Sequence, residues 1–132
     1  MLKKWLHTFT ILFVSMSLYG QNITKIKVIS IPLYTTSTFR ITCNEFDKNF
    51  PEMKKEVILN KNKVREIEVV LSSFKAINSK GIDVRGKLVI CYNKKRNKVI
   101  CFNLFGHFFF DGGFFENKKL FNFLLLNKFI AY

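Results

Sequence analysis

Hydrophobic and polar residues alternate in the first part of the chain beyond residue 20. In residues 23–33 lysines alternate with aliphatic residues, and in residues 38–44 polar residues alternate with Phe39, Ile41 and Cys43. A shorter apolar run follows at residues 56–59. A period of two is typical of strands with one buried face. The pattern therefore predicts two strands and a third, short one.

Two later segments carry the period of an amphipathic helix. In the first, apolar residues recur at spacings of three and four: Val64, Ile67, Leu71 and Phe74. Either Asn60 or Asn62 can cap its start. The second helix is expected at about residues 118–130, after Asn117 as its cap. Its apolar set is Leu120, Phe121, Phe123, Leu124, Leu125, Leu126 and Phe129.

Between these helices the sequence predicts a hairpin and one further strand. Residues 88–92 and 99–104 are strand-like runs around a polar turn, and residues 104–110 lead into the turn Asp111-Gly112-Gly113. The predicted order is β-β-(β)-α-β-β-β-α. This order indicates an α+β fold, an antiparallel sheet of about five to six strands with two helices packed on it.

The first 20 residues have the parts of a secretory signal peptide. Lys3 and Lys4 precede an apolar run from about Phe9 to Leu18, and small residues offer cleavage near Gly20 or after Ser17. The apolar run is shorter than a membrane span needs, although an uncleaved anchor helix is the alternative. We therefore expect a secreted or periplasmic protein, cleaved near Gly20/Gln21, with one small α+β domain at 21–132 and no stable membrane span.

The chain has three cysteines, so at most one intramolecular disulfide can form. A three-residue loop in the predicted hairpin would pair Lys94 with Lys98 and place Cys91 directly opposite Cys101. Cross-strand cysteines at that separation can form a disulfide, although two reduced thiols are the alternative. Cys43, alternating with apolar residues, is expected to be a buried core thiol.

The chain is strongly basic, with a net charge of +13 that becomes +11 once Lys3 and Lys4 leave with the signal peptide. A charge of this size favours anionic partners. The basic residues are 18 Lys and only 4 Arg, and they lie in short runs such as the basic turn Lys94-Lys95-Arg96. Because Arg is the preferred residue for phosphate recognition, specific nucleic-acid binding is disfavoured. Electrostatic binding to an anionic surface or polyanion stays open.

Few residues are suited to catalysis. Beyond residue 20, His107 is the only histidine, and the sequence has no G-x-S-x-G motif. The cysteine and histidine spacings match no common metal site, and no glycine loop is followed by the lysine and hydroxyl that bind phosphate. We therefore expect no enzyme, no cofactor and no metal. A small hydrolase that uses His107 with a cysteine thiol is the alternative.

Six phenylalanines gather near the end of the chain, at positions 105, 108, 109, 110, 114 and 115. On a strand, Phe105, His107 and Phe109 would face away from Leu104, Phe108 and Phe110. If both helices cover one sheet face, the first row is left as an aromatic surface for a partner. We therefore expect a binding module that contacts a protein or cell-envelope component through Phe105, His107 and Phe109. The alternative is that loops or the first strands cover this aromatic surface, or that it forms the core of a homodimer.

Overall fold

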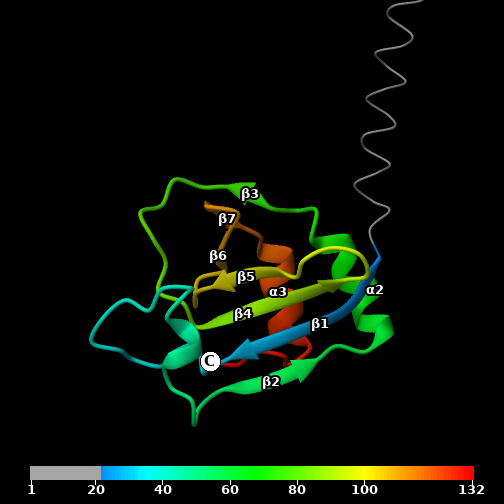
Figure 1. The fold of residues 1–132 in the computed structure, drawn as a ribbon. Coiled ribbons are helices and arrows are strands. Elements are labelled where there is room, and N and C mark those ends of the chain that lie inside the picture. The colour runs from blue at the N-terminus through cyan, green and yellow to red at the C-terminus, as the bar shows by residue number, and fades with distance from the viewer. Residues whose placement is uncertain (1–21) are drawn as a thin grey trace, which may run out of the picture.

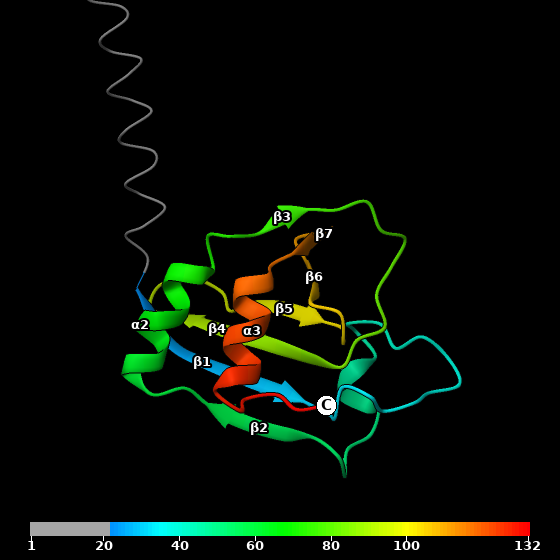
Figure 2. The ribbon, with the colours of Figure 1, turned by 180° about the vertical axis from the view of Figure 1, so that it is seen from behind.

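A computed structural model of the chain describes residues 22–132, so the predicted signal peptide lies outside the described residues. The domain is α+β, with an antiparallel seven-stranded sheet and two α-helices against one of its faces (Figures 1 and 2). The predicted class is therefore confirmed, with more strands than expected.

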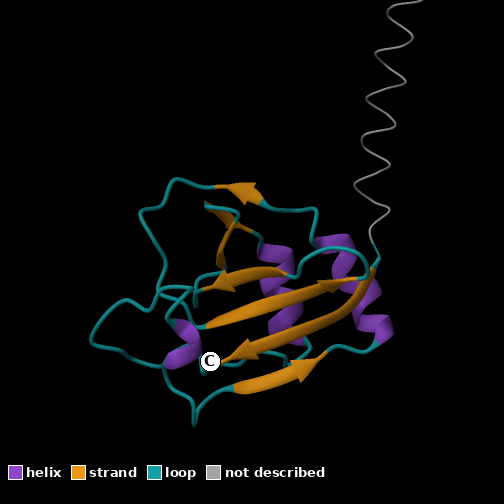
Figure 3. Ribbon diagram, in the orientation of Figure 1, coloured by secondary structure: helices purple, strands orange, loops and turns teal. Residues whose placement is uncertain are grey.

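The strands follow the order β2-β1-β4-β5-β6-β7-β3 across the sheet (Figure 3). Their bounds are β1 (Ile23–Ser30), β2 (Lys55–Ile58), β3 (Lys75–Ala76), β4 (Gly86–Tyr92), β5 (Lys98–Phe102), β6 (His107–Phe110) and β7 (Gly113–Glu116). The long β1 and β4 pair over most of their length in the middle of the sheet. The short β2 and β3 form its edges.

The two helices begin at the asparagines that the sequence indicated. Asn60 caps α2 (Lys61–Val70), because its Oδ1 accepts a hydrogen bond from the Lys63 N–H at 2.9 Å. Asn117 caps α3 (Lys118–Leu126) through the Leu120 N–H at 3.0 Å. Each side chain satisfies a backbone donor that the first helical turn leaves unpaired.

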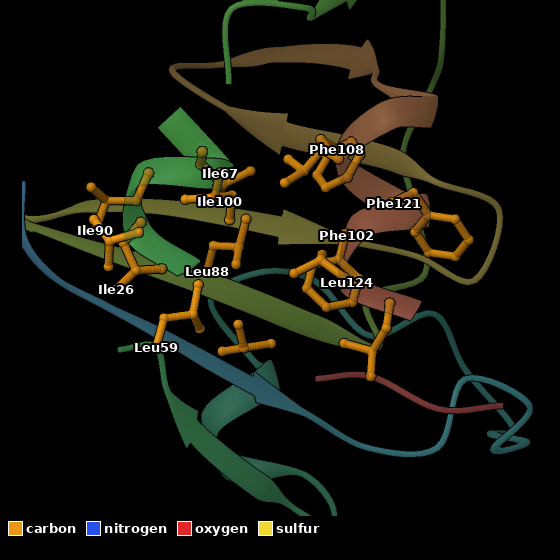
Figure 4. Close-up of a cluster of buried hydrophobic side chains, with 14 of the residues drawn as sticks. Ile26, Leu59, Ile67, Leu88, Ile90, Ile100, Phe102, Phe108, Phe121 and Leu124 are labelled. Carbon is orange, nitrogen blue, oxygen red and sulfur yellow. The ribbon is translucent and has the colours of Figure 1, made fainter. Parts of the chain in front are cut away.

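The main core lies between these helices and the sheet (Figure 4). Alternate residues of the central strands meet the apolar stripes of both helices, as the two periodicities require. Fully buried members from the sheet are Ile26, Val28, Leu88, Ile90, Ile100, Phe102 and Phe108, and those from the helices include Ile67, Leu120 and Leu124. This layer fixes which face of β5 and β6 points away from the helices.

The face of the sheet away from the helices carries a second, smaller core. Residues 31–50, here called the covering segment, lie over it and include the short 3-10 helix η1 (Phe46–Lys48). Ile41 and Phe46 of the covering segment are fully buried there, in a cluster with Cys101 of β5. Phe109 and Phe114 pack against this cluster while staying half-buried.

The strand predicted at residues 38–44 is wrong, because this part of the covering segment is a loop. Phe39 is 57% exposed whereas Ile41 is buried, so the alternation does not form a common face. The Ile41 N–H donates to the Asp83 carboxylate at 2.8 Å, and the Ile41 carbonyl accepts from the Val84 N–H at 2.9 Å. The Asp83 side chain and a single backbone N–H thus replace a neighbouring strand as the hydrogen-bond partners of Ile41.

The β4–β5 hairpin forms, but its register differs from the prediction. Leu88 lies opposite Ile100, whereas a three-residue loop would have placed Tyr92 there. The offset is an even number of residues, so the apolar side chains keep the predicted face. Gly86 lies opposite Phe102, and a Cβ at Gly86 would overlap the Phe102 ring. The ring occupies the space that a side chain at residue 86 would need, which favours the observed register.

The strand expected at residues 104–110 is shorter in the structure and begins at His107. A tight turn at Asp111 and Gly112 connects it to β7, and both residues have positive φ, 50° and 71°. This geometry suits the twist of a hairpin and explains the Asp-Gly pair. The sequence had indicated the turn, whereas β7 and the two-residue β3 were not expected as strands.

Candidate binding cavity beside the disulfide

The disulfide joins Cys43 of the covering segment to Cys101 of β5, with their Cα atoms 5.8 Å apart. The predicted pair of Cys91 and Cys101 is therefore wrong, and Cys91 is free. The cause is the register of the hairpin, which places Lys87 rather than Cys91 opposite Cys101. The expectation of Cys43 as a thiol is corrected as well. The disulfide ties the covering segment to the middle of the sheet.

An open cavity of about 230 Å³ lies beside this disulfide. Its apolar walls include Phe109, Phe114, Ile82 and Val84, and Cys43 also lines it. Phe109 of β6 and Phe114 of β7 are directly paired across their hairpin, with ring centroids 5.0 Å apart and ring planes tilted by 40°. The hairpin thus presents two neighbouring aromatic rings to the cavity.

Two cations, Arg40 and Lys80, also line this cavity, and the side chains of both residues are exposed. The Arg40 guanidinium lies across Gly81, where an added Cβ would come within 2.5 Å of Nη1. Neither cation takes part in an ion pair among residues 22–132. The nearby Asp83 carboxylate binds the Ile41 N–H through Oδ1 and Arg85 through Oδ2, each at 2.8 Å.

Sequence reasoning had not singled out these two cations. Arg40 falls at a polar position of the strand predicted at residues 38–44, and Lys80 lies outside every element that the sequence predicts. Their proximity depends on where the covering segment crosses the sheet, and no local pattern encodes that crossing. Phe114 belonged to the phenylalanine cluster that the sequence did indicate.

The three residues predicted to bind a partner do not form one flat row. Phe109 lines the cavity, whereas Phe105 is 72% exposed at the turn before β6. His107 is half-buried beside Phe105, with ring centroids 6.3 Å apart. The Asn103 Oδ1 accepts hydrogen bonds from the backbone N–H groups of Phe105 and His107, both at 2.9 Å. Asn103 thereby fixes this turn.

The basic turn Lys94-Lys95-Arg96 is exposed at the tip of the β4–β5 hairpin. Lys95 Nζ lies 4.6 Å from the centre of the Tyr92 ring, a cation–π distance. Burial, and to a lesser extent the Asp111 carboxylate, raise the pKa of Tyr92 above its usual range. The Asn93 N–H donates to the Asn22 carbonyl at 3.2 Å, so the turn lies beside the start of β1.

The hydrolase alternative would need a thiol near His107. The disulfide removes Cys43 and Cys101 as nucleophiles, and Cys91 lies on β4, opposite Lys25 and two strands from β6 in the sheet. Residues 22–132 contain no group of three or more His, Cys, Asp or Glu side chains that could hold a metal ion. No helix in this part of the chain combines the length and apolar character required to cross a membrane.

The chain matches no known protein family, no curated protein and no solved structure. The function is therefore inferred from the geometry of the cavity and its surroundings.

Proposed function

We propose that this protein is an exported, non-enzymatic binding module that captures a protein or cell-envelope component through the cavity formed by Phe109 and Phe114. The single observation that carries this proposal is the open, aromatic-walled cavity beside the disulfide. Half-buried aromatic side chains around a concavity are typical of sites that anchor a partner. The pairing across β6 and β7 also holds the two rings on a sheet rather than on a loop.

The chemistry of the cavity favours binding over catalysis. Its described lining consists of apolar side chains, a disulfide sulfur, Thr42 and two cations, with neither a carboxylate nor a histidine. Such a set can hold a ligand, and the exposed Lys80 is the only side chain in this lining of a type that serves as a general base. A disulfide is stable in oxidising compartments, and together with the signal-peptide pattern it supports export.

The test is partner capture by wild-type protein and by two matched variants, Phe109→Ala and Phe105→Ala. A bifunctional crosslinker added to the envelope fraction of the source organism should give one adduct with wild-type protein. Phe109→Ala should reduce its yield at least tenfold, because this substitution removes one wall of the cavity. Phe105→Ala should leave the yield unchanged, since Phe105 does not line the cavity.

Circular dichroism of both variants must match the wild type for the comparison to hold. Alanine is preferred to aspartate at position 109, because a carboxylate would be buried in part against the second core. Equal capture by Phe109→Ala would refute the cavity as the binding surface. Loss of the crosslinked adduct in Phe105→Ala alone would mean that the partner binds at the turn around His107 instead.

One observation favours a second candidate, an electrostatic binder of anionic surfaces. The three residues of the basic turn are all exposed and adjacent. Their joint replacement by alanine should abolish retention on vesicles rich in phosphatidylglycerol. Retention of the wild type should weaken at about 0.3 M salt, because screening weakens charge-driven contact.

A further inference from the structure

We infer that the cavity takes one large apolar side chain of a partner protein, and that Arg40 and Lys80 hold a carboxylate next to that side chain. This inference rests on the proposed function and specifies the chemistry of the occupant. It joins three observations: the size of the cavity, its aromatic wall and the unpaired cations.

The size of the cavity selects a single side chain. Pockets that enclose a drug-sized ligand or cofactor have volumes of about 300–1,000 Å³. The cavity holds only about 230 Å³ and is open to solvent. It is therefore too small to enclose a cofactor or a lipid chain, but it can accept one anchoring residue of a protein surface. Such anchors dominate the affinity of many interfaces.

The walls favour an aromatic anchor. Phe109 and Phe114 are tilted by 40° with centroids 5.0 Å apart, and Ile82 and Val84 complete the apolar lining. A third ring can pack edge-to-face or offset against such a pair, which are the arrangements that aromatic rings prefer. The ring of a tryptophan or phenylalanine of a partner would pack against Phe109 and Phe114 in such an arrangement.

The cations specify the group beside the anchor. Arg40 and Lys80 share the cavity without an acidic partner in the described part of the chain. A guanidinium binds a carboxylate through two parallel hydrogen bonds, and Gly81 leaves the space in which the Arg40 guanidinium lies. The net charge of +11 that remains without Lys3 and Lys4 also attracts acidic partners over a distance. The carboxylate can be an acidic side chain or a chain terminus.

A nucleobase with its phosphate is the rival occupant, because aromatic rings near cations also bind single-stranded nucleic acid. The observations favour the protein side chain. Phe109 and Phe114 are half-buried against the second core and line one small cavity, whereas single-stranded nucleic acid is bound by a groove along which successive bases stack. Arg, the residue best suited to phosphate, is also scarce in the whole chain.

Four small probes test the inference by NMR titration of the folded domain. N-acetyltryptophan carries the ring and a terminal carboxylate, and N-acetylglutamyltryptophanamide carries the ring and a side-chain carboxylate. N-acetyltryptophanamide carries the ring alone, and thymidine monophosphate represents the nucleotide. Both carboxylate probes should shift the amide signals of Gly81, Phe109 and Phe114. At least one of them should bind about five- to tenfold tighter than the amide, and the tighter one identifies the source of the carboxylate.

Matched variants assign the charge effect to the two cations. Lys80→Ala and Arg40→Gln should each cut the advantage of the carboxylate probe to about twofold, while binding of N-acetyltryptophanamide stays unchanged. Lys61→Ala is the control, because it removes the same charge from the exposed start of α2, on the helix side of the sheet. It should leave all affinities unchanged.

The outcomes separate this inference from the proposed function. Equal binding of the amide and both carboxylate probes would overturn the inference and leave the cavity as a binding site. Tighter binding of thymidine monophosphate would also overturn it, in favour of the nucleobase. If no probe shifts Phe109 or Phe114 at millimolar concentration, the cavity accepts no side chain and both proposals fail.

Discussion

Replacing Cys43 and Cys101 together with alanine should lower the free energy of unfolding by about 4 kcal/mol. The disulfide closes a loop of 58 residues. In the chain-entropy treatment, a loop of this length removes about 14 cal/mol/K from the unfolded state, which is about 4 kcal/mol at 25 °C. Stabilities of single domains are about 5–15 kcal/mol, so the loss is a large part of the total.

The native state should tolerate the replacement. Cys101 is fully buried, so alanine is preferred to serine, because a serine hydroxyl would be buried without a hydrogen-bond partner provided for it. Cys43 is half-buried and follows the Ile41 anchor, whose hydrogen bonds to Asp83 and Val84 do not depend on the disulfide. The covering segment therefore stays attached to the domain after the disulfide is removed, also because the Ile31 and Leu33 N–H groups donate to the Arg85 and Ala131 carbonyls.

The assay is urea unfolding of residues 21–132, followed by circular dichroism. With a slope of about 1.5 kcal/mol per molar urea, the midpoint should fall by roughly 2–3 M. Reductant should produce a similar fall in wild-type protein and none in the double variant. Cys91→Ala is the matched control and should keep both the midpoint and the response to reductant, because Cys91 is free.

Two results would refute this reasoning. A wild-type midpoint that reductant leaves unchanged would mean that the disulfide contributes no stability. A digest in which the peptide containing Cys91 is linked to that containing Cys101 would mean that the sequence-based pairing is correct after all. In that case Cys91→Ala, rather than Cys43→Ala, would abolish the response to reductant.

Two further predictions concern the helices and the basic hairpin. Asn117→Ala should cost about 2 kcal/mol, against about 1 kcal/mol for Asn60→Ala, in the same urea assay, because the buried Asn117 caps α3 and also donates to the Val70 carbonyl at 2.8 Å. Equal losses would mean that the bond to Val70 contributes nothing. Because the pKa of Tyr92 is raised in the folded protein, the unfolded chain loses this proton first as the pH rises. The contribution of Tyr92 to the free energy of unfolding should therefore be complete below pH 10 and fall as the pH rises above it. Tyr92→Phe should flatten that fall, and an unchanged slope between pH 10 and 11 would contradict the assignment.

The sequence was sufficient to predict which face β4 and β5 bury. Alternation depends only on residue parity, so Leu88, Ile90 and Ile100 were assigned to the same face even though the pairing was offset. Helix caps are equally local: Asn117 was predicted from its position, and Asn60 was one of two candidates with Asn62. Short-range chemistry of this kind can be inferred from neighbouring residues.

The offset of the hairpin and the path of the covering segment depend on distant contacts. The register reflects the fit of the Phe102 ring over Gly86. The covering segment is held at Ile41 by Asp83, which lies 42 residues later in the chain. The disulfide depends on both features, so its pairing was predicted wrongly. The cavity also depends on contacts between distant residues, because Arg40, Lys80 and Phe109 come from three separate parts of the chain.

The cavity and the disulfide are consequently one structural unit. Cys43 is both a half of the disulfide and part of the cavity lining, and Cys101 lies directly opposite Phe109 in the sheet. The disulfide holds the covering segment, which carries Arg40, against the strand that neighbours the aromatic wall. A compartment that reduced this bond would loosen one side of the cavity and remove about half of the stability of a typical small domain. We therefore expect reduction of the disulfide to weaken the binding that we propose for this cavity.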